Sequence, residues 1–501
     1  MEEQYKRLLE LLGEVSDLQA AAAVLGWDQQ TYMPPGGAQG RSMHLATITR
    51  LAHEKFVNEE IGELLEALKS EAADLDPDSD EACIVKQVSR EYEKQRKVPG
   101  EWVADFSRVT SMAHQSWEKA RKESDFPTFE PDLESVFELR RQYVDFFTPY
   151  DHIYDPLLDD FEPGLKTSDV IQIFEELRPK QVELVQAIAE SSNSIDDAVL
   201  YQSFDETKQW DFGEEVIKAF GYDFDRGRQD KSPHPFTTSF SIDDVRITTR
   251  VRPDFLSTAL FGTLHEAGHA MYEQGISDSL ARTPLEGGTS LAVHESQSRM
   301  WENLVGRSKP FWVAFYSRLQ EYFPSELGDV KLDDFYQAIN LVEPSLIRVE
   351  ADEATYNLHI MLRFELELAL LEQQLKVSDL PEVWNQKMDE YLGVTPPNDA
   401  EGVLQDIHWS MGIFGYFSTY SLGNLIATML WDKMKIDIPD LEKQIELGKF
   451  DDLLGWHREK IHQHGGKYEP MDLVKRATGS ELSAEPYIRY LQTKFGEIYD
   501  L

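Results

Sequence analysis

Apolar residues recur at spacings of three and four over most of this 501-residue chain, and this period constrains its fold more than any other feature. The pattern is clearest in three stretches, IGELLEALKSEA (61–72), FELELALLEQQLK (364–376) and YIRYLQTKFGEIY (487–499). An α-helix turns once in about 3.6 residues, so this spacing gathers apolar side chains on one face that can pack into a core. The sequence therefore predicts a mainly α protein.

Turn-forming residues and one β-pattern interrupt the helices. The Pro-Pro-Gly-Gly run at 34–37 predicts a turn, and the acidic stretch 74–81 predicts a linker that ends in a helix N-cap. The segment TTSFSIDDVRITTRV (237–251) alternates β-branched and aromatic residues around an Ile-Asp-Asp turn, which predicts a hairpin. A helix should follow, with Pro253 and Asp254 at its start and Gly275 at its end. Because no internal repeat or flexible tether divides the chain, we expect residues 1–501 to form a single domain.

The composition excludes several classes of partner. The chain has 49 Lys and Arg against 91 Asp and Glu, and its net charge of -42 would be repelled by nucleic acids and anionic membranes. Cys83 is the single cysteine, which excludes an internal disulfide and favours the cytoplasm. The first residues lack the pattern of a signal peptide, and no stretch approaches the ~18 apolar residues of a membrane span.

The sequence HEAGH at 265–269 lies inside the helix predicted after the hairpin. His265 and His269 are four residues apart, so both imidazoles project from one face and can bind one tetrahedral zinc ion. Glu266 could then take a proton from a water that zinc acidifies and pass it to the leaving amine. The alternative is a buried histidine pair bonded to carbonyl groups, with an exposed glutamate beside it. The hairpin, which could offer an edge strand to a peptide, favours the zinc interpretation.

A third protein ligand is expected on the following helix, Thr289 to Ser308, capped by Thr289 or Ser290. Glu295 is our predicted ligand, and Glu302 is the competitor two turns later. The alternative for either glutamate is a surface carboxylate paired with Arg299.

Several motifs together resemble the thermostable (Taq-type) metallocarboxypeptidase family, whose relatives are the angiotensin-converting and thimet-type peptidases. They span nearly the whole chain in the family's order. The motifs are DVRIT (244–248), HEAGH (265–269), HESQS (294–298), IRVEAD (347–352) and GVLQDIHW (402–409).

The resemblance implies a zincin-like helical fold with a long substrate groove and a small sheet beside the zinc helix. It further implies that residues 1–95 form a helical lid over the groove, that the enzyme is a homodimer, and that it removes single residues from peptide C-termini. One zinc per chain, for which cobalt could substitute, would be held by His265, His269 and Glu295. Glu266 would be the general base and acid.

An enzyme that trims free C-termini needs a cation for the terminal carboxylate, and an arginine can bind it bidentately. Arg348 of IRVEAD is the first candidate. Arg246 of DVRIT is the second, and its alternative is an ion pair with an acid such as Asp244 or Asp352.

Donors facing the oxyanion are expected from His408 together with Tyr416 or Tyr420, by analogy with the relatives. His234 could contact the substrate backbone, or it could pack in a turn. Asp352 and Asp406 are candidates for orienting the zinc histidines.

Two other functions remain open at this stage. The same zinc chemistry would serve an oligopeptidase or a dipeptidyl carboxypeptidase, which release internal fragments or dipeptides. From a different class, the chain could be a catalytically silent helical scaffold with a vestigial metal site. Three ligands and a neighbouring base favour a catalytic site, because a structural zinc site normally has four protein ligands.

Overall fold

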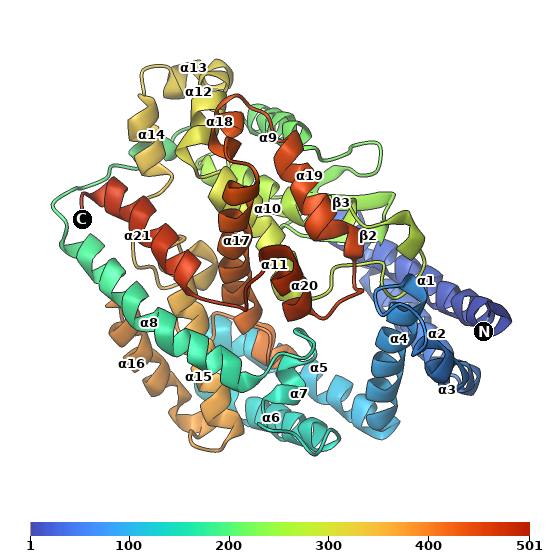
Figure 1. Cartoon of the computed structure of the whole chain (residues 1–501). Helices are drawn as coiled ribbons and strands as arrows, with labels where there is room; N and C mark the ends of the chain where they lie inside the picture. The colour runs from blue at the N-terminus through green and yellow to red at the C-terminus, as the bar shows by residue number, and fades with distance from the viewer. Residues whose placement is uncertain (1) are drawn as a thin grey trace. The chain divides into compact units, whose positions relative to one another are not determined.

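The computed structural model describes residues 2–501, and it is mainly helical with a small three-stranded sheet (Figure 1). The predicted mainly α fold is therefore confirmed. The chain divides into two compact units. The first contains the chain up to Arg96, Asp196–Ile339 and Leu430–Glu481, and the second contains Lys97–Ile195, Asn340–Met429 and Leu482–Leu501.

The first unit carries the sheet and most of the helices. Its helices are α1 (Glu2–Thr31), α2 (Ala38–Phe56), α3 (Glu59–Ala72), α4 (Asp80–Lys97, whose last residue falls in the second unit), α9 (Glu206–Phe220), α10 (Ser257–Glu273), α11 (Leu291–Arg299), α12 (Lys309–Tyr322), α13 (Pro324–Leu327), α14 (Leu332–Ala338), α18 (Leu441–Glu446), α19 (Asp451–Lys460) and α20 (Pro470–Thr478).

The second unit is built from helices alone, among the residues that the structure describes. These are α5 (Gly100–Glu123), α6 (Glu130–Asp145), α7 (Asp155–Leu158), α8 (Thr167–Glu190), α15 (Tyr356–Leu371), α16 (Leu380–Leu392) and α21 (Glu485–Tyr499). Helix α17 (Ser418–Asp437) begins in this unit and ends in the first.

Polar caps and glycine define helix ends where the sequence supplies them. The side chain of Asp205 accepts a hydrogen bond from the backbone N–H of Lys208 and so caps the start of α9. Gly221 ends the same helix at a φ of 110°, a conformation that glycine adopts without a steric cost. The predicted turn at 34–37 falls between α1 and α2. The predicted linker at 74–81 follows α3, and its last two residues, Asp80 and Glu81, already belong to α4.

The N-terminal helices form a core within the first unit. Leu8 and Leu12 of α1, Leu65 of α3 and Val88 of α4 are buried in one apolar cluster, which also includes Leu280 from the segment after α10. Helices α1 and α2 lie side by side in Figure 1. Helices α1, α3 and α4 of the predicted lid (residues 1–95) thus share a core with the segment that follows the helix of the HEAGH motif. The role of this region as a lid over a groove stays a prediction.

The sheet has the strand order β1-β3-β2. β2 (Thr237–Ser241) and β3 (Asp244–Thr249) pair antiparallel and form the predicted hairpin. β1 (Gln229–Lys231) pairs parallel with β3. Its three polar or charged residues give no strand pattern, which is why the sequence did not predict it. Val245 and Ile247 of β3 are fully buried, as their alternation indicates.

Helix α10 begins at Ser257, so the predicted start at Pro253 and Asp254 is wrong by a few residues. Phe204 N–H donates to the carbonyl of Pro253, and the Gln209 amide donates to the carbonyl of Arg252. These bonds hold residues 252 and 253 beside α9, and residues 253 and 254 form a turn before the helix. The end of the helix, at Glu273, agrees with the prediction of a stop at Gly275.

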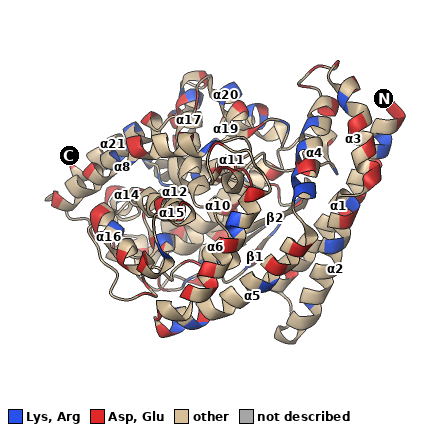
Figure 2. Cartoon of the chain, turned by 90° about the horizontal axis from the view of Figure 1, so that it is seen from below, with Lys and Arg blue, Asp and Glu red and all other residues tan. Residues whose placement is uncertain are grey.

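None of the helices in residues 2–501 is long and apolar enough to cross a membrane. Acidic residues occur on helices throughout the chain (Figure 2), so the excess of negative charge is not confined to one segment.

Candidate metal and active site

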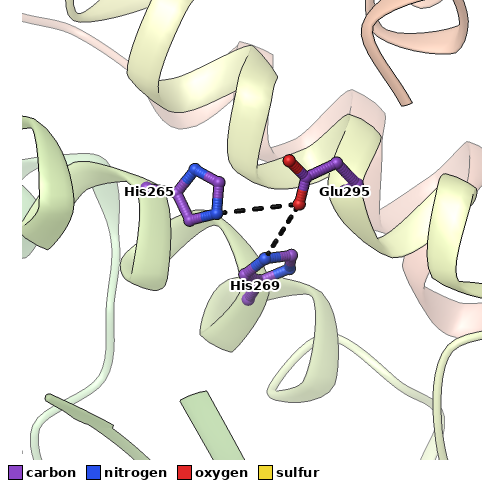
Figure 3. A group of neighbouring side chains, drawn as sticks. All are labelled: His265, His269 and Glu295. Atoms are coloured by element: carbon purple, nitrogen blue, oxygen red, sulfur yellow. Dashed lines mark ion pairs between the residues drawn. The ribbon is translucent and has the colours of Figure 1, made fainter. Parts of the chain in front are cut away.

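Three side chains from two helices converge in the first unit (Figure 3). His265 and His269 extend from α10, and Glu295 extends from α11, whose start is capped by the Ser290 hydroxyl. The Oε2 atom of Glu295 lies 3.6 Å from Nε2 of His265 and 3.5 Å from Nε2 of His269. One donor atom from each of the three residues lies within 4.8 Å of the other two.

This arrangement fits a zinc ion. Ligand atoms about 2.1 Å from a tetrahedral metal lie about 3.4 Å from one another, and both measured separations are close to that value. The charge of Glu295 also fits, because Arg299 donates to its other oxygen, Oε1, at 2.7 Å. Although burial opposes the shift, Arg299 and the two histidines hold the pKa of Glu295 well below its usual range. The carboxylate is therefore ionised and presents Oε2 to the imidazoles.

Glu302 supports the first histidine. Its Oε2 lies 2.8 Å from Nδ1 of His265, and Arg299 and Arg307 neutralise its charge at 3.2 and 3.6 Å. Burial would lower the pKa of His265, but Glu295 and Glu302 outweigh it and raise that pKa to about 9. Glu302 thus holds the Nδ1 side of His265, opposite the Nε2 atom that faces Glu295.

His294 lies next to the second histidine, with its Nδ1 2.6 Å from Nδ1 of His269. Burial lowers the pKa of His269 to about 4, so this imidazole is neutral. The hydrogen-bond partners of the two candidate metal-binding histidines are therefore Glu302 and His294, and the prediction that Asp352 or Asp406 orients them is wrong. Asp352 accepts from backbone groups of its own turn, and Asp406 is paired with arginines.

Glu266 is buried beside the two histidines and is held by the sheet. The hydroxyl of Thr237 on β2 donates to Glu266 Oε2 at 2.7 Å and lies 3.0 Å from the Glu266 carbonyl. Burial raises the pKa of Glu266 above its usual value, against the opposing effects of His265 and Thr237. A carboxylate with a raised pKa is a stronger base than an exposed one, which suits proton transfer near neutral pH.

The two other candidates of the first unit lie near the hairpin. Arg246 makes a double hydrogen bond to Asp244 at 2.8 Å, and its guanidinium lies over the rings of Trp27 and Phe240 at 4.4 and 4.8 Å. Arg246 therefore forms the ion pair with Asp244 that was predicted as the alternative to substrate binding. His234 is exposed, and its carbonyl accepts a hydrogen bond from Ser232.

The second unit brings Arg348 and Asp406 together in a buried ion pair. Nε and Nη2 of Arg348 donate to Asp406 Oδ1 at 3.1 and 2.8 Å, and Nη1 donates to the Tyr356 hydroxyl at 3.1 Å. Arg363 donates to the other carboxylate oxygen at 2.6 Å. Two guanidiniums share one carboxylate, so this cluster keeps one net positive charge. Although burial opposes it, the arginines lower the pKa of Asp406 far below its usual value.

His408, Tyr416 and Tyr420 lie together in the same unit. The ring of His408 is 5.3 Å from that of Tyr416, and the Tyr420 hydroxyl donates to the Tyr416 hydroxyl at 3.4 Å. Arg348 lies 5.2 Å from the Tyr420 ring. Burial lowers the pKa of His408 to about 4, so its imidazole is neutral. The structure thus groups the residues predicted to bind the carboxylate and the oxyanion.

Sequence reasoning missed the supporting residues of both clusters. Thr237, Tyr356 and Arg363 were not considered, and His294 entered only as the first residue of the HESQS motif. The available indications were the segment HPFTTSF (234–240), which contains Thr237, and the HESQS motif, which begins with His294.

Comparison with known proteins finds relatives along the whole chain. Residues 7–495 match the family model described as Carboxypeptidase Taq (M32) metallopeptidase. Thermostable carboxypeptidase 1 of Thermus thermophilus is 42% identical and the alignment covers 99% of both proteins. Carboxypeptidase 1 of Bacillus subtilis is 40% identical, with 99% of this chain and 98% of the relative covered. The crystal structure of the M32 carboxypeptidase from Deinococcus radiodurans R1 has a TM-score of 0.97 at 40% identity, and all of both chains is covered.

Proposed function

The chain belongs to the carboxypeptidase Taq (M32) metallopeptidase family, and from this premise we propose that it is a zinc enzyme that releases single amino acids from the C-termini of peptides. Because the chain belongs to this family, it is a metal-dependent hydrolase of peptides. We propose the identity of the metal, the roles of the residues and the size of the product.

The observation that carries the proposal is the convergence of His265, His269 and Glu295 at tetrahedral spacing, with Glu266 beside them. Two imidazoles and one carboxylate are a donor set typical of catalytic zinc, which keeps one position open. When bound, zinc supplies a Lewis acid that polarises a water molecule and the peptide carbonyl.

Glu266 then acts as the general base and the general acid. Its carboxylate takes a proton from the attacking water and delivers it to the nitrogen of the departing amino acid. The hydrogen bond from Thr237 leaves the carboxylate one preferred orientation, so the base is positioned before the substrate arrives.

Arg348 is our candidate for the group that selects a free C-terminus. Of the five N–H donors of an arginine, the bonds among residues 2–501 engage three, two with Asp406 and one with Tyr356. The remaining donors, and the net positive charge of the cluster, can hold a terminal carboxylate. His408, Tyr416 and Tyr420 would donate to the oxyanion. Arg246 and His234 stay secondary candidates for substrate binding.

We propose the cytoplasm as the location, on the basis of a single buried cysteine, and a homodimer, as the family resemblance implies. Sedimentation of the purified protein tests whether it is a homodimer.

The deciding experiment is a digest of one defined peptide by the purified protein, with zinc or cobalt and with a chelator. We expect a ladder of products that are each one residue shorter, with zinc bound at one ion per chain and activity lost on chelation. Dipeptide products would indicate a dipeptidyl carboxypeptidase, internal fragments an oligopeptidase, and an intact peptide in the presence of bound metal a silent scaffold. Activity on the same peptide with an amidated C-terminus should be much lower.

A further inference from the structure

Three side chains form a line behind the candidate metal ligand His269. Nδ1 of His269 lies 2.6 Å from Nδ1 of His294, and Nε2 of His294 lies 2.7 Å from Oε1 of Glu273. Glu273 is one helical turn beyond His269 on α10, whereas His294 comes from α11, where it directly precedes Glu295. The line thus connects the two helices that carry the ligands.

The direction of the hydrogen bonds follows from the chemistry of imidazole. Nε2 of His269 faces Glu295 and would give its lone pair to the metal, so the ring proton must be on Nδ1. His294 Nδ1 must then accept that proton's hydrogen bond, which leaves the proton of His294 on Nε2. This second proton points at the carboxylate of Glu273, which accepts it. Each ring has one permitted tautomer.

From this geometry we propose that His294 and Glu273 are positioning residues that fix the tautomer and orientation of His269 for metal binding. The proposal rests on the proposed metal site. Neither residue contacts the substrate or the reacting atoms in this proposal, and both act through His269.

The surroundings of His294 hold its ring in this one position. The ring of Tyr272 lies 5.0 Å from it on one side. Gly288 also lies close to the ring, because an added Cβ at that position would lie 2.7 Å from His294 Cδ2. The backbone N–H of Gly288 also donates to Glu273 Oε1 at 3.2 Å. The carboxylate oxygen therefore accepts from two fixed donors, and this arrangement sets where the His294 ring can point.

The two zinc histidines are supported in different ways. His265 meets the carboxylate of Glu302 directly, and two arginines neutralise that carboxylate. His269 meets a carboxylate only through a second imidazole. Groups that orient metal-binding histidines typically contribute about 10–100-fold to metal affinity. A loss of that size is therefore what removal of the His294 and Glu273 contacts should cause.

The test measures zinc affinity by competition with a chelator for the parent and five variants. His294→Phe keeps a ring against Tyr272 but removes the acceptor, and Glu273→Leu removes the carboxylate at similar volume. Both should lower zinc affinity by about 10–100-fold. Glu273→Gln keeps an oxygen that accepts from His294 and Gly288, so its affinity should stay within about threefold of the parent. Leucine and glutamine preserve the packing of Glu273 alike, but only glutamine keeps the hydrogen bonds. A difference in zinc affinity between the two variants therefore shows positioning and not packing.

His457→Phe is the matched control. His457 is fully buried in the same unit, and neither of its ring nitrogens has a hydrogen-bond partner among residues 2–501. Its replacement removes a buried imidazole without touching the line, so zinc affinity should equal that of the parent. Thermal unfolding of each metal-free variant identifies any that do not fold, and His294→Phe and Glu273→Leu each test the proposal on their own.

Parental affinity in folded His294→Phe or Glu273→Leu would overturn the proposal, as would equal losses in Glu273→Gln and Glu273→Leu. His265→Ala in the same assay shows which inference has failed. If it loses zinc while His294→Phe does not, the metal site stands and the positioning role falls. If His265→Ala also binds zinc like the parent, the metal lies elsewhere and both proposals fall.

Discussion

Gly268 on α10 lies directly against the backbone of α11 at Gln297. A Cβ atom at position 268 would be 2.6 Å from the Gln297 carbonyl oxygen and 2.7 Å from the Cα of Ser298. Gly268 directly precedes His269, and Gln297 is two residues beyond Glu295. The absence of a side chain at Gly268 thus sets the distance between the helices that carry the three candidate ligands.

Gly268→Ala should therefore weaken the metal site. Because the obstructing atoms are backbone atoms, the helices must move apart, and overpacking of this kind costs about 1–3 kcal/mol of unfolding free energy. Glu295 would move away from His265 and His269, so we expect zinc affinity to fall at least about tenfold, in line with other changes that disturb ligand orientation. Chelator competition and urea unfolding measure the two effects.

The control for this prediction is Gly262→Ala on the same helix. A Cβ there would meet its nearest atom at 3.8 Å, which is an ordinary contact. Alanine favours a helix over glycine, so this variant should be as stable as the parent or more stable, with unchanged zinc affinity. If both alanine variants have the same zinc affinity and unfolding free energy, the close approach of the helices at Gly268 does not determine the geometry of the site.

Glu266→Gln should separate metal binding from chemistry. The amide keeps the shape of the carboxylate but cannot accept a proton from water, so kcat should fall by about 10²–10⁴-fold while zinc stays bound. Thr237→Val removes the hydroxyl that orients the base and should cause a smaller loss, again in kcat rather than in zinc content. Metal analysis and steady-state kinetics on one peptide check both variants, and near-parental turnover of Glu266→Gln would exclude it as the base.

The candidate ligands His265 and His269 and the candidate base Glu266 could be named from the sequence because the pattern that groups them is local. Four residues along a helix bring His265 and His269 to one face, whatever the rest of the fold is. The hairpin was predictable for the same reason, since alternation along two short strands is visible in the sequence. The polar strand β1 carries no such pattern and pairs with β3 only because the fold brings it there.

The supporting contacts could not be predicted because they depend on how helices cross and how they deviate from the regular α form. Glu302 lies in a π-helical segment, Met300–Val305, that follows α11, and it reaches His265 from there. Asp406 was one of two candidates for orienting His265 and His269. In the structure Asp406 is neutralised by Arg348 and Arg363, which are 58 and 43 residues away in the sequence.

Glu367 in the second unit gives a prediction about pH. It is fully buried and accepts hydrogen bonds from the Tyr154 hydroxyl at 2.6 Å and the Trp409 indole at 2.8 Å. Burial raises its pKa to about 7 from an ordinary value of 4.5, although these donors oppose the shift. The folded state thus binds this proton more tightly than the unfolded state does. The contribution of Glu367 to the unfolding free energy is complete below about pH 4.5 and is lost as the pH rises through about 7.

Glu367→Gln removes this titration. The unfolding free energy of the parent, relative to that of the variant, should therefore fall by up to about 3 kcal/mol between pH 4 and pH 8. Urea unfolding of both proteins at several pH values measures the difference. A difference that does not change with pH would show that Glu367 titrates normally in the folded protein.

Arg348 tests whether the enzyme recognises a free C-terminus. If its guanidinium holds the terminal carboxylate, Arg348→Ala removes a charge-assisted contact worth about 1.5–3 kcal/mol, or about 10–150-fold in kcat/KM. Asp406 keeps its bond to Arg363 in this variant, so no unpaired carboxylate is left behind to disturb the unit. Arg348→Lys should recover only part of the loss, because a single ammonium replaces a planar fork.

The loss at Arg348 should depend on the substrate. A peptide with an amidated C-terminus has no carboxylate, so the parent should cleave it poorly and Arg348→Ala should cleave it little worse than the parent does. Measuring kcat/KM for the free and the amidated peptide on parent and variant gives a double difference in which general structural damage largely cancels. Equal losses on both peptides would make Arg348 a structural residue of the Asp406 cluster. Arg246 would then be the next candidate, although its guanidinium is already bonded to Asp244 and lies against Trp27.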